Sequence, residues 1–201
     1  MRRLAFAAAM AVFSVVPAKA DVVDYAELFG GLTFDPSQDV NGVSTDVDTG
    51  FNVGGSLGWN LSPQFALEAD FFFTSSDYDL AAPADGSLES FSFMANAVWN
   101  IDMGSGCRPY IGAGVGGVQL RFTDGVTSFG DPYTGDADIV FGYQGFAGVA
   151  VNVDNNIDFI AEYRYQGADD ANGTFTVLGV PTPVDFEYSS HNLTAGFRFN
   201  L

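Results

Sequence analysis

The sequence predicts an all-β fold, an eight-stranded antiparallel up-and-down transmembrane β-barrel, and three observations support this prediction. Stretches in which apolar residues alternate with polar or small ones recur eight times along the chain. The connections between these stretches alternate between short and long, as they do around a barrel that spans an outer membrane. The chain is rich in glycine and phenylalanine, with 24 and 20 residues, and only 16% of its residues are charged. Such a chain must hide a large apolar area or face something other than water.

Residues 1–20 precede these stretches and have the pattern of a secretory signal peptide. Two arginines open the segment, an apolar run follows from Leu4 to Val16, and Ala18-Lys19-Ala20 forms an A-x-A cleavage site. The apolar run is too short to cross a bilayer as a helix. We therefore expect a signal peptide at 1–20, a barrel domain at 21–201 and no transmembrane helix.

Each alternating stretch is predicted to be a strand, because successive side chains of a strand point to opposite faces. In chain order the strands are 25–34, 51–61, 65–73, 91–101, 109–122, 139–153, 157–166 and 191–201. Most keep one apolar face throughout. The strand at 109–122 changes phase, with Ile111 and Val115 on one face but Val118 and Leu120 on the other. A β-bulge at Gly116-Gly117 would restore a single apolar face.

Four of the strands end in the same pattern, in which asparagine follows an aromatic or apolar residue. These asparagines are Asn60, Asn100, Asn152 and Asn200. We expect them at similar depth inside the barrel, with Trp59, Trp99 and Phe199 outside in an aromatic girdle. The last strand is then a descending strand that closes against the first, which removes the free edge of the sheet.

The connections differ in length and in charge. Three are short (62–64, 102–107 and 154–156) and four are long (35–50, 74–90, 123–137 and 167–187). The long connections are rich in Asp and Glu and contain no Lys or Arg. They are expected outside the cell, with the short turns and both termini in the periplasm.

A soluble barrel such as a lipocalin has the same alternation with its faces reversed. It would turn Trp59, Trp99, Phe197 and Phe199 inward, although an eight-stranded barrel has room for little more than ordinary side-chain filling. Its exterior would be Asn, Ser and Gly without lysine, an unusual surface for a protein in water. The sequence favours lipid outside and a polar interior.

The charge balance excludes several classes of function. Without residues 1–20 the chain keeps four arginines and no lysine, and four positive minus 25 negative charges gives −21. Such a chain cannot neutralise the phosphates of a nucleic acid. Cys107 is the single cysteine and His191 the single histidine, so neither a disulfide framework nor a Cys/His zinc site is expected. We expect no cofactor and no metal site.

Charged residues on the polar faces predict a network in the lumen. The segments FALEADF and FIAEYRY superpose, which aligns Glu68 with Glu162 and Asp70 with Arg164. Glu27 begins the first strand and Arg198 nearly ends the last, so these two should lie low in the lumen. Buried charges require partners. We expect these six residues to form a salt-bridged plug, and a gated ion path is the alternative.

The strongest candidate for catalysis is the series Glu187, Ser189 and His191 just above the last strand. Residues i and i+2 of a strand stand nearly 7 Å apart, so the three in a line cannot form a hydrogen-bonded relay unless the strand bends. A rim of polar residues where the loop enters the membrane explains these three residues without catalysis. We expect no enzymatic activity.

The chain resembles small outer-membrane β-barrels of the OmpA-like and opacity-protein class. The resemblance rests on the signal peptide and on the segments FALEADFFF, RPYIGAGVGG and LTAGFRFNL. It implies folding by the barrel-assembly machinery, which reads a terminal phenylalanine in many such barrels; here Leu201 is last and Phe199 stands two residues before it.

A structural or surface-interaction role in the outer membrane of a Gram-negative bacterium is therefore expected, without enzymatic activity. Outer-membrane lipid and lipopolysaccharide are the expected partners, the latter through divalent cations bridged to the acidic loops. The alternative function is a small diffusion pore or a transporter of hydrophobic solutes, which a continuous glycine stripe through the lumen would favour.

Overall fold

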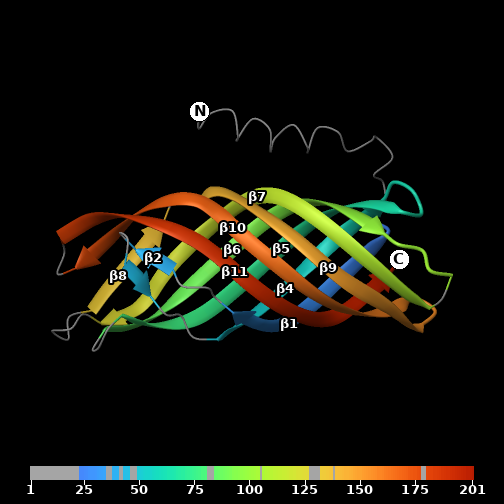
Figure 1. Cartoon of the computed structure of the whole chain (residues 1–201), viewed down its shortest axis with the longest axis horizontal. Helices are drawn as coiled ribbons and strands as arrows, with labels where there is room; N and C mark the ends of the chain where they lie inside the picture. Colours follow the sequence, from blue (N-terminus) through green and yellow to red (C-terminus); the bar gives the residue numbers. More distant parts are fainter. Residues whose placement is uncertain are drawn as a thin grey trace.

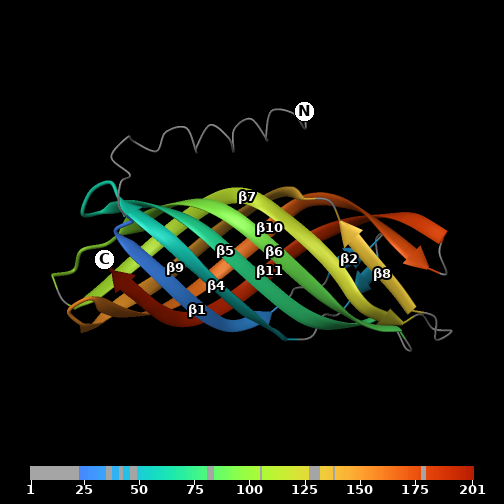
Figure 2. The same cartoon turned by 180° about the vertical axis from the view of Figure 1, so that it is seen from behind.

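In the computed structural model the chain forms a closed antiparallel β-barrel whose wall consists of eight strands, as the sequence predicts (Figures 1 and 2). The structure describes residues 23–34, 38–40, 43–45, 49–80, 84–104, 106–126, 132–137, 139–177 and 180–201. The wall strands are β1 (Tyr25–Phe34), β4 (Gly50–Asn60), β5 (Phe65–Leu80), β6 (Ala84–Asn100), β7 (Cys107–Val126), β9 (Val140–Asp154), β10 (Ile157–Val177) and β11 (Val180–Asn200). The expected signal peptide at 1–20 lies outside the described residues.

The two ends of the barrel differ in the length of the connections between strands. Tight turns join β4 to β5, β6 to β7 and β9 to β10 at the end that also holds the C-terminus, and we call this the short-turn end (Figure 1). The strands continue into long hairpins at the opposite end, the long-hairpin end. Three additional strands, β2 (Gln38–Val40), β3 (Val43–Thr45) and β8 (Pro132–Ala137), lie at this second end.

Pairing of the first strand with the last closes the barrel, as expected. The register of β1 with β11 runs without interruption from Tyr25 opposite Asn200 to Phe34 opposite His191. The backbone N–H of Leu201 donates to the carbonyl of Asp24 over 2.9 Å, which continues the pairing past the last strand residue. Every residue of β1 is therefore paired with β11, and β1 has no free edge.

The two faces of the wall confirm the expected orientation of the strands. Large apolar side chains cover the outside, where Leu28 is 65% and Phe93 66% exposed. Aromatic rings pair across neighbouring strands there, and the ring centroids of Phe71 and Phe93 lie 5.1 Å apart. The inside carries the polar members of the alternation. A soluble barrel would need the reverse arrangement.

The long connections contain more strand than the sequence predicts. β5 continues to Leu80 and β6 begins at Ala84, while β10 continues to Val177 and β11 begins at Val180. Backbone hydrogen bonds can extend a hairpin beyond the membrane, where neither face meets lipid and the alternation of side chains is lost. Most acidic side chains of these hairpins, Glu187 among them, lie outside the described set.

The expected β-bulge in β7 is absent, so this prediction is wrong. The register of β7 with β6 and with β9 continues unbroken past Gly116 and Gly117. Val118 and Leu120 instead point inward and are fully buried, while Arg121 is exposed outside. The phase changes toward the edge of the apolar belt, where outward Gln119 lies opposite Phe91 and Arg121 lies over the same ring. Inward positions then bury apolar groups, and outward positions carry polar ones.

No described helix is long and apolar enough to cross a bilayer.

Candidate functional site

One cluster of charged side chains fills the lumen near the short-turn end. Arg198, on β11, donates from Nε to Glu27 Oε1 over 2.6 Å, and its Nη2 lies 3.8 Å from Glu68 Oε1. Ser56 donates to Glu27 over 2.7 Å, and the Tyr25 hydroxyl donates to Glu68 over 2.6 Å. Four strands thus contribute to a single network, and Arg198 is only 4% exposed.

A second charged cluster lies nearer the middle of the barrel. Arg164, on β10, pairs with Asp70 through Nη1 at 2.8 Å and with Glu162 through Nε at 2.9 Å. Gln144 extends the network, because its Nε2 donates to Asp70 Oδ2 over 3.2 Å and to Asn96 Oδ1 over 2.7 Å. Arg164 is 1% exposed. The guanidinium is therefore held between two carboxylates away from water.

Uncharged polar side chains occupy the lumen toward the long-hairpin end. Thr33 donates to Asn192 Oδ1 over 2.8 Å, and Asn192 Nδ2 donates to the Ser190 hydroxyl over 3.1 Å. Asn52 lies within 3.3 Å of the Thr33 hydroxyl. Thr33, Asn52, Ser190 and Asn192 are all buried. The lumen is thus filled by paired polar groups at three successive heights.

Aromatic rings, which the sequence analysis did not place in the lumen, pack against both arginines. Arg198 lies 4.4 Å from the ring centroid of Tyr25 and 5.3 Å from that of Tyr110. Arg164 lies about as close to three phenylalanines, Phe29, Phe72 and Phe146. Cation–π attraction adds to the ion pairs at such distances, and more strongly where water is excluded. Each arginine is consequently enclosed by rings and by carboxylates.

Each of these rings lies opposite a glycine on a neighbouring strand. Tyr25 stands opposite Gly58, Phe29 and Phe72 opposite Gly54, Tyr110 opposite Gly148 and Phe146 opposite Gly112. A Cβ atom added at Gly112 would lie 2.2 Å from the Phe146 ring, and one at Gly58 would lie 2.0 Å from the Tyr25 ring. These glycines therefore leave the space that the aromatic rings occupy. They do not line an open stripe.

Replacing Gly112 by valine is expected to destabilise the barrel by about 1–3 kcal/mol, the usual cost of overpacking a filled interior. The added methyl groups would displace the Phe146 ring, which also packs on Arg164. Urea unfolding of the protein in lipid vesicles, followed by tryptophan fluorescence, measures this loss.

Gly145→Val is the matched control, because nothing lies within 4 Å of a Cβ added there. Valine is also the better strand former, so this control should be neutral or slightly stabilising. Equal stability of the two variants would show that no ring is seated at Gly112.

The six residues expected to form a lumen network are all buried in the lumen, and they divide between the two clusters. Glu27, Glu68 and Arg198 meet near the short-turn end, and Asp70, Glu162 and Arg164 meet nearer the middle. The rings around them lie on the polar faces, where alternation alone does not single them out. The signal for them is a glycine at the facing position of a neighbouring strand, which is visible only once the register is known.

Of the residues considered for catalysis, Ser189 and His191 lie on the outer side of β11, and the side chain of Glu187 lies outside the described set. His191 Nδ1 is hydrogen-bonded to the Tyr163 hydroxyl at 2.5 Å, and its ring centroid lies 5.1 Å from that of Tyr165. His191 is thus engaged by tyrosines of β10. Among the described side chains, no group of three or more His, Cys, Asp or Glu is arranged to hold a metal ion.

Comparisons with known proteins agree with this architecture. The family model described as outer membrane protein beta-barrel domain matches residues 5–199. The chain is similar to the crystal structure of Neisserial surface protein A, with 21% identity and a TM-score of 0.59 over 88% of this chain and 96% of that one. It is also similar to the outer membrane protein OprG of Pseudomonas aeruginosa, with 15% identity and a TM-score of 0.62 over 89% and 96% of the two chains. No protein with a curated description matches the chain.

Proposed function

This chain belongs to the outer membrane protein beta-barrel domain family, and from that premise we propose that it is a sealed, non-enzymatic barrel whose long acidic hairpins face the exterior of a Gram-negative cell. The observation that carries this proposal is the filled lumen. Arg164 and Arg198 are buried and paired, with the rings packed against them. A barrel closed in this way acts through its surfaces.

The alternative, a diffusion pore or a transporter of hydrophobic solutes, is less well supported. A glycine-lined path through the lumen would favour it, but the inward glycines described above lie under aromatic rings. An ion path would also need to pass two clusters in which each guanidinium is already bound by carboxylates. Permeation would require several of these contacts to break together.

The proposed orientation places the short turns and both termini in the periplasm. Asp77, which is exposed on β5 beyond the apolar belt, and the single cysteine Cys107 at the start of β7 lie at opposite ends of the barrel. The Asp77→Cys, Cys107→Ser variant should react with a membrane-impermeant maleimide in intact cells. The unsubstituted protein should react only after the outer membrane is opened. The reverse result would contradict the orientation.

We further propose that divalent cations bridge the acidic hairpins to phosphates of lipopolysaccharide. Carboxylate oxygens are preferred ligands of Ca²⁺ and Mg²⁺, and the four long connections contain acidic residues without a single Lys or Arg. Removal of divalent cations should then speed the labelling at position 77, because bound head groups leave. Labelling of Cys107 in the unsubstituted protein is the control, because it increases only if the chelator has opened the outer membrane. An unchanged rate of maleimide labelling at position 77 would show that the hairpins are solvated surface without cation bridges to lipopolysaccharide.

A further inference from the structure

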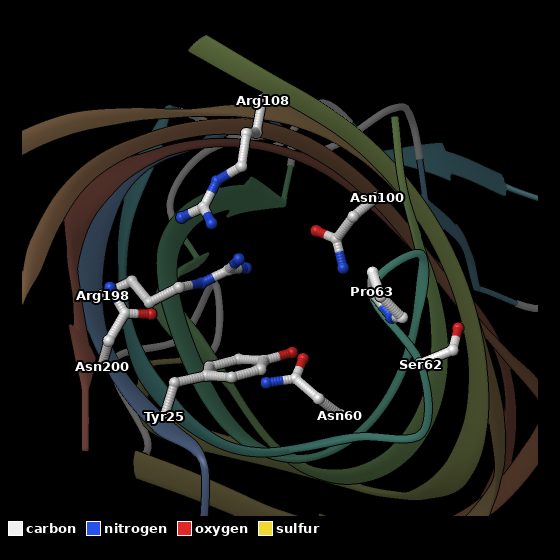
Figure 3. Close-up of a pocket in the computed structure, with 8 residues that line it drawn as sticks. All are labelled: Tyr25, Asn60, Ser62, Pro63, Asn100, Arg108, Arg198 and Asn200. Atoms are coloured by element: carbon white, nitrogen blue, oxygen red, sulfur yellow. The ribbon is translucent and has the colours of Figure 1, made fainter. Parts of the chain in front are cut away.

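A pocket of about 340 Å³ opens at the short-turn end, below the Arg198 cluster (Figure 3). Its lining includes Arg108 and Arg198, two of the four arginines outside residues 1–20, and Asn60 and Asn100, the last residues of β4 and β6. No carboxylate is among the residues that line it. This is unusual in a chain with 25 acidic residues. The pocket is therefore rich in hydrogen-bond donors.

Arg198 lines this pocket and keeps one guanidinium nitrogen without a hydrogen bond. Its Nε donates to Glu27, while its buried Nη2 lies 3.8 Å from Glu68 Oε1, too far for a hydrogen bond, and makes none with the described residues. Figure 3 shows the guanidinium directed into the pocket, with Tyr25 beside it. A buried donor without an acceptor costs free energy, and the cost is greater when the donor is charged. A bound acceptor would recover part of that cost.

Arg108, near the start of β7, points into the same space (Figure 3). It is held by an ion pair with the buried Asp158, which also accepts hydrogen bonds from Asn152 at 3.0 Å and Asn200 at 3.1 Å. This support fixes the direction of the guanidinium. The side chain is still 45% exposed, so it remains accessible to a solute that enters the mouth.

We propose that this mouth pocket binds a small organic solute through a single carboxylate. Guanidinium groups and carboxylates match in geometry and form charge-assisted hydrogen bonds. The acids behind the arginines, Glu27, Glu68 and Asp158, limit the negative charge that the pocket tolerates, which disfavours a doubly charged phosphate. Pro63, which is exposed at the mouth, provides an apolar flank for the body of the solute. In the proposed orientation this solute comes from the periplasm.

NMR of the arginine side chains tests the site in detergent solution, where the outcome does not depend on orientation in the cell. Residues 21–201 contain only Arg108, Arg121, Arg164 and Arg198, so four Nε–Hε signals are expected. Titration with lactate should shift the signals of Arg108 and Arg198 and leave those of Arg121 and Arg164 in place. Lactamide, its neutral analogue, should bind at least about tenfold more weakly, which corresponds to 1.4 kcal/mol.

Variants distinguish the pocket from general attraction of anions. Arg108→Gln should abolish the response of Arg198 to lactate, whereas Arg121→Gln, on the outside of the barrel, should not change it. The proposal is overturned if no signal shifts, if lactamide or chloride at equal ionic strength acts like lactate, or if Arg121 shifts with the others. Phosphate binding as tight as that of lactate would overturn the assignment to a carboxylate.

Discussion

Replacing Arg164 by alanine is expected to destabilise the barrel by about 3–5 kcal/mol, the range found when one partner of a buried ion pair is removed. The guanidinium is 1% exposed and pairs with Asp70 and Glu162. Its loss leaves two carboxylates in the lumen without a cation and leaves three phenylalanine rings around a cavity. Urea unfolding in lipid vesicles, followed by the fluorescence of Trp59 and Trp99, measures the change.

Arg121→Ala is the matched control, since it removes the same charge from an exposed position. Arg121 lies over the Phe91 ring at 5.4 Å, an interaction worth about 0.5–1 kcal/mol at an exposed site. The combined variant Arg164→Met, Asp70→Asn, Glu162→Gln should recover much of the loss, because it removes the unpaired charges together with the arginine. An Arg164→Ala variant as stable as Arg121→Ala would contradict a dry, paired cluster.

Much of the wall could be predicted from the sequence, because lipid outside and polar groups inside impose a period of two on every strand. This constraint placed the eight strands, the short turns and the closure of β11 on β1. It also placed the six charged residues on inward positions. The constraint ends with the apolar belt. For this reason neither the extension of the hairpins nor the inward turn of Val118 and Leu120 could be derived from it.

The contents of the lumen were harder to predict, since they depend on contacts across strands. Phe71, Phe72 and Phe73 are identical in type, yet Phe72 is buried inside while its neighbours lie on the outer face. Alternation indicates that the middle residue points inward but not how a ring fits in a narrow barrel. The fit depends on Gly54, which faces Phe72 on the adjacent strand. Such pairs emerge only from the register.

Conductance of the purified protein in a planar bilayer tests the sealed lumen most directly. Two ion-paired clusters and the rings packed on them predict that the unsubstituted protein shows no steady current above that of the bilayer alone. A porin inserted under the same conditions provides the positive control. To show that the barrel has inserted, the protein is delivered in lipid vesicles that are fused with the planar bilayer, and folded protein is recovered from those vesicles. Large, stable open steps from the unsubstituted protein would contradict the sealed lumen and favour the pore.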